Sequence, residues 1–127
     1  MLAEALGMKV IFYDVEPKMA LGNAHAVKSL DSLLEHSDIV TLHVPQLPTT
    51  KNLINAERLK KMKTGAVLIN CARGNVVKIK SVREALLEKK IAGYAADVFP
   101  EEPQSNEDKF VSELQGLSNV ILTPHIG

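Results

Sequence analysis

The sequence predicts an α/β protein with an open parallel sheet and helices on both of its faces. Short apolar runs of strand length alternate along the 127 residues with segments whose apolar residues recur at helical spacing. Strands that alternate with helices in this way are typical of right-handed βαβ units around a parallel sheet. Polar or ionisable residues follow most of the strands and are rare inside them. The length suits at most one domain, since a domain usually has about 100–200 residues.

The first three predicted elements are a strand, a helix and a second strand. Lys9–Asp14 (KVIFYD) is rich in β-forming residues and ends in an acid. Ser29–His36 (SLDSLLEH) carries leucines at positions 30, 33 and 34, which lie on one face of a helix. Asp38–Val44 (DIVTLHV) is a strand that stops at Pro45, because proline cannot continue the hydrogen bonds of a central strand.

The remaining elements continue this alternation. In chain order they are a helix at Asn55–Met62, a strand at Ala66–Ala72, a helix at Ser81–Lys90, and strands at Tyr94–Val98 and Asn119–Leu122. The run AVLINCA is almost continuously apolar, which predicts a strand buried on both faces. The last of the helices ends in two lysines, where the helix dipole favours positive charge. Pro100–Leu114 is the least regular stretch and is expected on the surface.

The composition argues against several classes of partner and location. Lys and Arg together number 15, as do Asp and Glu, so no basic surplus favours nucleic acid as a partner. No apolar run approaches the roughly 20 residues of a membrane span, and Glu4 interrupts the apolar start, so neither a membrane anchor nor a signal peptide is expected. Cys71 is the only cysteine, which rules out an internal disulfide and favours a reducing compartment. The cytoplasm is the expected location.

Ligands of an open parallel sheet bind outside the carboxyl ends of its strands. The residues expected at that edge are Asp14, His43, Val44, Pro45, Cys71, Ala72, Arg73, Gly74, Asp97, Glu101, Glu102 and His125. Nearly every strand delivers a polar or ionisable group to this edge. The pattern therefore predicts part of a nucleotide-binding α/β domain with an acid–base site.

Two of these residues could bind a ligand or serve the structure alone. An acid that ends a strand about 20 residues after a glycine fingerprint binds the adenosine ribose of NAD, but Asp14 could instead cap the next turn. No G-x-G occurs in the chain. Arg73 follows a strand, where its forked guanidinium could clamp a carboxylate or form a salt bridge at the rim of the sheet.

His125 is the candidate acid–base group, since an unperturbed histidine titrates near physiological pH. The alternative is a histidine that is hydrogen-bonded in the core. A carboxylate partner would orient the ring and favour its charged form. On spacing alone, Glu101 and Glu102 are equal candidates for that partner.

The other histidines and the cysteine carry weaker signals. His25 and His36 are expected in solvent, in or near polar helix segments, and His43 is expected at a strand end where it could line a cofactor cleft. Cys71 lies in the apolar run, which favours an inert, buried side chain over a nucleophile. No pair of His, Cys, Asp or Glu has metal-ligand spacing, so no metal site is predicted.

Four ordered blocks of sequence resemble the D-isomer-specific 2-hydroxyacid dehydrogenases. They are DIVTLHVP, MKTGAVLINCARGNVV, IAGYAADVFPEEP and NVILTPHIG, and the resemblance runs through almost the whole chain. It implies a Rossmann-like NAD-binding domain of an oxidoreductase whose substrate is a small 2-hydroxyacid. A finer resemblance, notably in ALGNA after the strand-end acid, is to the members that oxidise 3-phosphoglycerate to 3-phosphohydroxypyruvate in serine biosynthesis. In full-length form such an enzyme is expected to be a homo-oligomer.

The resemblance implies a role for each matching residue. Arg73 would bind the substrate carboxylate and polarise its 2-oxo group. Glu102, the acid just before Pro103, would pair with His125, which takes the proton of the 2-hydroxyl as hydride leaves. The residues implied in binding NAD are Asp14 at the adenosine ribose, Asp97 at the nicotinamide carboxamide, and His43, Val44, Pro45, Cys71, Ala72, Arg73 and His125 along the cleft.

Two residues and several missing parts depart from the family pattern. Lys78 stands where the family usually has an acid, and Ala96 where a leucine is common. The opening residues read as the last turns of a helix. The glycine-rich loop, the first central strand, the substrate domain and any regulatory domain are expected to lie outside this chain.

Residues 1–127 are therefore interpreted as a partial NAD-binding domain. Alone, the chain is expected to bind NAD weakly and to turn over no substrate, because the pyrophosphate would lack its glycine amides and helix N-terminus. Two alternatives stay open beside the enzyme: an NAD(H)-sensing, corepressor-type binding module, and a non-functional remnant of a dehydrogenase.

Overall fold

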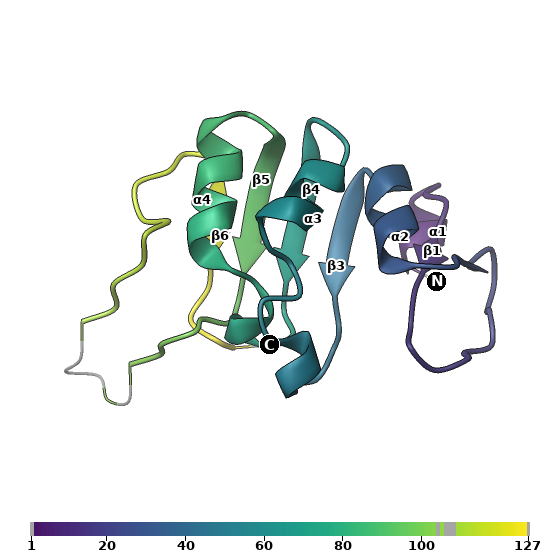
Figure 1. Cartoon of the computed structure of the whole chain (residues 1–127), viewed down its shortest axis with the longest axis horizontal. Coiled ribbons are helices and arrows are strands. Elements are labelled where there is room, and N and C mark those ends of the chain that lie inside the picture. The colour runs from purple at the N-terminus through teal and green to yellow at the C-terminus, as the bar shows by residue number, and fades with distance from the viewer. Residues whose placement is uncertain (1, 104, 106–108, 127) are drawn as a thin grey trace.

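A sheet of four parallel strands, in the order β3-β4-β5-β6, forms the centre of the structure. The structure is a computed structural model that describes residues 2–103, 105 and 109–126. The strands of this sheet are β3 (Ile39–Leu42), β4 (Ala66–Asn70), β5 (Ile91–Ala96) and β6 (Val120–Leu122). Two further strands, β1 (Ile11–Phe12) and β2 (His25–Ala26), pair in parallel as a separate sheet. Figure 1 shows this small sheet, in purple, on the side of β3 that faces away from β4.

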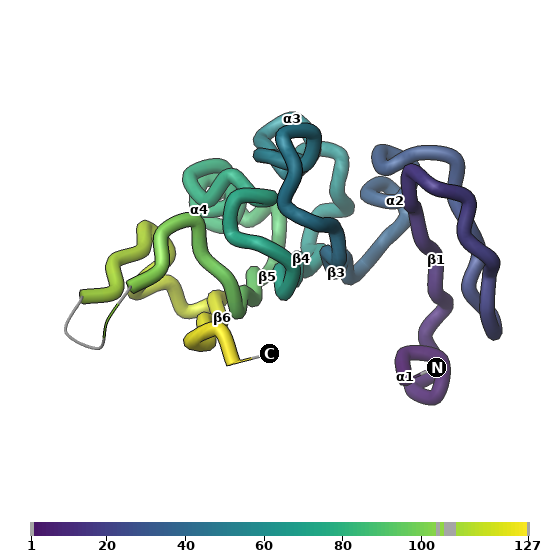
Figure 2. The backbone as a smooth tube through the Cα atoms, turned by 90° about the horizontal axis from the view of Figure 1, so that it is seen from below, coloured from purple at the N-terminus to yellow at the C-terminus, as the bar shows by residue number. Residues whose placement is uncertain are grey.

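Helices and short 3₁₀ turns connect the strands in the described part of the chain. They are α1 (Leu2–Ala5), α2 (Leu30–His36), α3 (Ala56–Lys61), α4 (Ile79–Leu87), η1 (Pro48–Thr50) and η2 (Gly74–Val76). Figure 2 shows α2, α3 and α4 on one side of the strands and α1 on the other side, next to β1. Among the described residues, no helix combines the length and the apolar character that crossing a bilayer requires.

Two of the three longer helices begin where a polar side chain takes up a free backbone N–H. Ser29 Oγ accepts from the N–H of Ser32 (3.1 Å) at the start of α2. Asn55 does the same for α3 by accepting from the N–H of Arg58 (3.1 Å). Lys78 occupies the equivalent position of α4 and makes no such bond, since an ammonium group cannot accept one. An acid at this position, which the family resemblance leads one to expect, could accept such a bond.

The hydrophobic core lies between the sheet and the helices α3 and α4. Leu68 of β4 and Tyr94 of β5 are buried, as are Leu59 of α3 and Leu86 of α4. The other face of the strands is only partly covered, so that buried and half-buried residues alternate along β4. The prediction that Ala66–Ala72 is buried on both faces is therefore wrong for the described chain, because α2, α3 and α4 all lie on one side.

The predicted helices and strands are all present, with shifted ends. The helix predicted at Ser81–Lys90 begins two residues earlier and ends three residues earlier. The strand predicted at Ala66–Ala72 ends at Asn70, where the chain turns. Strand β2 has no counterpart among the predicted strands, because two residues carry no apolar pattern. His25 is exposed as expected, but it lies in β2 and not near a helix.

Candidate active site

The carboxyl ends of the parallel strands face the same edge of the sheet, as the arrowheads of β3, β4 and β5 show in Figure 1. The turn after β4 carries Arg73, Asp97 directly follows β5, and His125 lies three residues beyond β6. Ligands of such a sheet bind along this edge. The fold therefore brings candidates from distant parts of the sequence to one side of the molecule.

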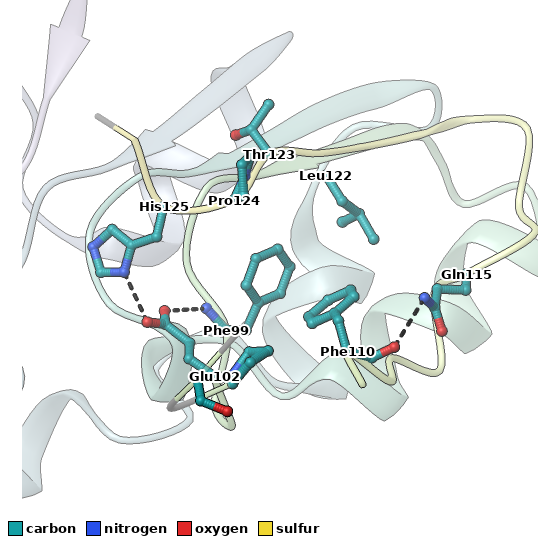
Figure 3. A pocket seen from close by; sticks show the side chains of 10 residues that line it. Phe99, Glu102, Phe110, Gln115, Leu122, Thr123, Pro124 and His125 are labelled. Carbon is teal, nitrogen blue, oxygen red and sulfur yellow. Dashed lines mark hydrogen bonds and ion pairs between the residues drawn. The ribbon is translucent and has the colours of Figure 1, made fainter. Parts of the chain in front are cut away.

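Glu102 and His125 form the central contact of the site. Oε2 of Glu102 lies 2.8 Å from Nδ1 of His125, and Figure 3 shows the two side chains facing each other. The other carboxylate oxygen, Oε1, accepts a hydrogen bond from the backbone N–H of Phe99 (3.1 Å). Of the two acids that spacing cannot separate, Glu102 and not Glu101 is therefore the one that contacts the histidine.

These contacts hold the pKa of the Glu102 carboxyl below its usual value. The hydrogen bond with His125 is the largest cause, the N–H of Phe99 comes second, and the charge of Arg73 adds a smaller effect. Because the carboxyl stays ionised at neutral pH, it can orient the imidazole through Nδ1. Nε2 is then the ring nitrogen that can exchange a proton with a ligand.

Asp97 holds the turn that carries His125. Its Oδ1 atom accepts hydrogen bonds from Oγ1 of Thr123 (2.5 Å) and from the backbone N–H of Ile126 (3.1 Å), on either side of the histidine. Asp97 is buried, so water competes little for these bonds. His125 has a φ of 55°, a left-handed conformation that is uncommon for a residue with a Cβ. The bonds of Asp97 help to keep the histidine in this conformation.

Arg73 lies beside the acid–base pair. It lines a hollow of about 250 Å³ together with Glu102 and His125, and the other lining residues are Gln46, Gly74, Val98, Phe99 and Pro100. The side chain of Arg73 is exposed, and its Nη1 donates to the carbonyl of Ala72 (2.7 Å). The three residues expected to be catalytic therefore surround one hollow at the carboxyl edge.

A larger hollow of about 640 Å³ borders the same Glu102–His125 pair. Phe99 and Phe110 line it, and Figure 3 shows their rings side by side. The two rings meet edge to face, with centroids 4.6 Å apart. Phe110 belongs to the irregular stretch Pro100–Leu114, of which residues 104 and 106–108 lie outside the described residues. This hollow is mainly apolar, in contrast to the one that Arg73 lines.

The first residues predicted to bind NAD follow β1 and β3 and line neither hollow. Asp14 is exposed just beyond β1, and its Oδ1 accepts from the backbone N–H of Glu16 (2.9 Å). It therefore caps a turn, and its exposure leaves the carboxylate accessible to a ligand as well. His43 and Pro45 are exposed after β3, and Val44 between them is half-buried. The roles of these residues toward NAD stay predictions.

Cys71 is exposed, which corrects the prediction of a buried side chain. The apolar run favours burial, but β4 ends at Asn70 and the chain turns there. Ala72, the next residue, is buried again. Cys71 is therefore an accessible thiol next to the turn of Arg73.

The remaining histidines lie away from the hollows. His36 ends α2 and is exposed as predicted, with Nδ1 2.8 Å from the carbonyl oxygen of Ser32. His25 is exposed in β2. Within the described residues, no group of three or more His, Cys, Asp and Glu side chains could hold a metal ion.

Two residues of the site, Asn70 and Gln46, have no place among the sequence-based candidates, whereas Gly74 is among the residues expected at this edge. Asn70 has no exposed surface and stands at the end of β4. Gly74 is buried after Arg73, and Gln46 lines the hollow of Arg73. Asn70 has a signal that could have found it, because it is the one strongly polar residue in the run AVLINCA. Gln46 follows Pro45 without any recognisable pattern.

Comparison with known proteins decides the family. The model of the family described as D-isomer specific 2-hydroxyacid dehydrogenase, NAD binding domain, matches residues 1–127. The chain belongs to this family. The resemblance carried by the four sequence blocks is thereby confirmed.

Two similar relatives are D-3-phosphoglycerate dehydrogenases. The one from Haemophilus influenzae is 56% identical over 126 residues, which make up 99% of this chain and 31% of the relative. The one from Escherichia coli K12 is 54% identical over 126 residues, with the same two shares of 99% and 31%. The 2-hydroxyacid dehydrogenase chain described here thus spans about a third of the length of these relatives.

A solved structure of the same family shares the fold. It is a D-isomer specific 2-hydroxyacid dehydrogenase from Lactobacillus delbrueckii ssp. bulgaricus in its NAD-complexed form, which superimposes with a TM-score of 0.86 at 34% identity. The match covers 98% of this chain and 40% of that one. It confirms the Rossmann-like α/β fold class that the sequence predicts.

Proposed function

We propose that the chain supplies the acid–base and carboxylate-binding groups of an NAD-dependent oxidoreductase that acts on the CH–OH group of a D-2-hydroxyacid. One observation carries this proposal: Glu102 and His125 lie 2.8 Å apart and share a hollow with Arg73. A carboxylate–imidazole pair beside a guanidinium can take a proton from a hydroxyl while the guanidinium holds a carboxylate. A 2-hydroxyacid carries these two groups on adjacent carbons.

His125 moves the proton in this reaction. In the oxidising direction, Nε2 takes the proton of the 2-hydroxyl, and Glu102 at Nδ1 stabilises the positive charge that develops on the ring. In the reducing direction, the same nitrogen returns the proton to the 2-oxo group. A group that must both accept and release a proton works best when it titrates near the working pH, as imidazole does.

Arg73 binds the carboxylate of the substrate and polarises its 2-oxo group. Its Nη1 is held by the carbonyl of Ala72 at 2.7 Å, which restrains the plane of the guanidinium. The other N–H groups of the fork can then donate to a carboxylate. Lysine would supply the charge without this forked geometry.

The residues along the carboxyl edge fit NAD. Asp14 presents an exposed carboxylate beyond β1, which can accept hydrogen bonds from ribose hydroxyls and would repel the extra phosphate of NADP. Val44 can offer apolar contact to the cofactor, and Asp97 lies where β5 ends. When bound, NAD accepts the hydride that leaves the 2-carbon.

We propose 3-phosphoglycerate as the substrate and 3-phosphohydroxypyruvate as the product, the step that opens serine biosynthesis. The support is the identity of 56% and 54% to two D-3-phosphoglycerate dehydrogenases over almost the whole chain. An enzyme of this kind is expected in the cytoplasm and, in its complete form, as a homo-oligomer.

The acid–base pair also argues against the two alternatives. An NAD(H)-sensing binding module needs the cofactor cleft but no hydrogen-bonded pair of Glu102 and His125. A non-functional remnant has no need of this pair or of Arg73 beside it. Both alternatives remain outcomes of the experiment below.

The experiment is a graft into the Escherichia coli relative. The matched segment of its D-3-phosphoglycerate dehydrogenase is replaced by this chain, and NADH formation from 3-phosphoglycerate is followed by absorbance. The graft is expected to be active. The 127 residues alone are expected to bind NAD weakly and to show no turnover, since they span only 31% of this relative.

His125→Asn in the graft should lower kcat by about 100- to 10,000-fold without loss of NADH binding, because general acid–base catalysis contributes that much. His36→Asn, a change of an exposed histidine away from the hollows, is the matched control and should have no effect. A graft that binds NADH but oxidises no 2-hydroxyacid would favour the binding module. A graft that neither folds nor binds NADH would favour the remnant.

A further inference from the structure

Asn70, the last residue of β4, uses both ends of its side-chain amide on the turn that follows. Oδ1 accepts from the backbone N–H of Ala72 (3.1 Å), and Nδ2 donates to the carbonyl of Arg73 (3.1 Å). The side chain has no exposed surface, so water cannot readily replace either bond. Asn70 therefore sets the path of the chain into Arg73.

Gly74, directly after the arginine, presses against the segment that leads to Glu102. A Cβ added to Gly74 would lie 1.9 Å from the carbonyl carbon of Phe99 and 2.4 Å from the backbone nitrogen of Pro100. Both are backbone atoms that cannot rotate away, so only glycine permits this approach. The N–H of Phe99 in turn donates to Glu102 (3.1 Å). Phe99 thus contacts both the turn of Arg73 and the carboxylate of Glu102, and it links the two.

The main chain of Asn70 reaches the pair by a second route. Its carbonyl accepts a hydrogen bond from the N–H of Asp97 (3.2 Å). The carboxylate of Asp97 holds the residues on either side of His125. Three loops that come from β4, β5 and β6 are therefore tied together through Asn70 and Gly74.

We propose that Asn70 and Gly74 are positioning residues for Arg73. They hold its guanidinium in register with the Glu102–His125 pair. This inference rests on the proposed function, because the carboxylate and the hydroxyl of a 2-hydroxyacid sit on adjacent carbons and the groups that receive them must keep a fixed spacing. A misplacement of about 1 Å can lower a rate by about 100-fold.

The test uses the grafted enzyme with two substitutions that act on the turn. Asn70→Ser keeps an acceptor for the N–H of Ala72 but is too short to reach the carbonyl of Arg73, and Gly74→Ala adds the clashing carbon. We expect each to lower kcat/KM for 3-phosphoglycerate by about 10- to 100-fold and to change KM for NAD far less. In an Arg73→Ala background, Asn70→Ser should cause no further loss, because no guanidinium remains to be positioned.

Asn55→Ala and Gly65→Ala are the matched controls. Asn55 also binds a backbone N–H, at the start of α3, and Gly65 has a φ of 83° with nothing within 4 Å of an added Cβ. Both substitutions should lower the melting temperature, since each removes a favourable local feature away from the site. Neither should change kcat/KM.

Unchanged kcat/KM in both turn variants would overturn the proposal. So would an equal loss from Asn70→Ser with and without Arg73, because the two residues would then act independently. If Gly74→Ala does not fold, Asn70→Ser alone decides. An unmodified graft without turnover would overturn the proposed function and, with it, this inference, whereas an active graft with unaffected variants would overturn the inference alone.

Discussion

Residues 2–28 and residues 30–126 differ in how much apolar side chain they bury. Every buried residue of the described chain lies at or beyond Leu34, and the main cluster fills the space between the sheet and the helices α3 and α4. The first segment instead exposes large apolar side chains, among them Leu2, Val15, Met19 and Leu21. Since burial of apolar surface is the main favourable term in folding, the second segment should set the stability of the chain.

This difference separates two parts of the predicted site. Arg73, Glu102 and His125 belong to the segment with the core, while Asp14 belongs to the segment without one. Strands β1 and β2 have two residues each, and polar contacts such as Asn23 Nδ2 to the carbonyl of Met8 (3.2 Å) support them. Mild destabilising conditions should therefore displace Asp14, which is expected to bind ribose, before they displace Glu102 and His125.

Truncation of one apolar residue in each segment tests the comparison most directly. Leu68 of β4 has no exposed surface, so Leu68→Ala should lower the free energy of unfolding by about 2–5 kcal/mol. Phe12 of β1 is only half-buried, so Phe12→Ala should cost clearly less although it removes more atoms. Urea unfolding followed by circular dichroism measures both. An equal cost would show that β1 shares fully in the core.

The capping of α3 and α4 sharpens the comparison inside the stronger segment. Lys78→Asp should raise the free energy of unfolding by about 1 kcal/mol, because an N-cap aspartate accepts a backbone N–H and suits the helix dipole. Asn55→Ala should lower it by about the same amount, since it removes the existing cap of α3. Thermal unfolding measures both changes. If Lys78→Ala stabilises as much as Lys78→Asp, loss of the lysine and not the new cap is responsible.

The smallest expected effect concerns the pH dependence of stability at Glu102. Its pKa is lowered in the fold, so its contribution to stability is present above the unfolded value near 4.5 and is lost as the pH falls through the lower folded value. At neutral pH, the melting temperature of the unmodified chain should be slightly higher than that of the Glu102→Gln variant. This difference should disappear in acid. The difference should be small, because both partners are partly exposed. Melting curves of both proteins from neutral to acidic pH measure it. A difference in melting temperature that does not change with pH would contradict the pairing of Glu102 with His125.

The order of strands and helices could be predicted because each segment carries its own pattern. The leucines of Ser29–His36 and the apolar run of β4 are local signals, and neither depends on what the chain does elsewhere. The pairing of Glu102 with His125 is different. Spacing leaves Glu101 and Glu102 equal, and only the family resemblance separates them before the contact at 2.8 Å is seen.

Other features of the site depend on contacts that no local pattern records. Gly74 matters because its backbone meets that of Phe99, which lies in another loop. Asn70 matters because its amide binds the next turn, although its polarity inside an apolar run is visible in the sequence. Cys71 shows the opposite error, since an apolar run predicts burial but cannot show where the chain turns. The one-sided cover of β4 likewise follows from where the helices lie.

The exposure of Cys71 has a practical consequence. It is the only thiol in the 127 residues, so a thiol-reactive fluorophore would attach at one known position without an engineered cysteine. That position lies between Asn70 and Ala72, at the edge where the strands end. A dye attached there would change its emission when a molecule approaches this edge. The natural chain thus carries a built-in attachment point for an optical reporter of ligand binding.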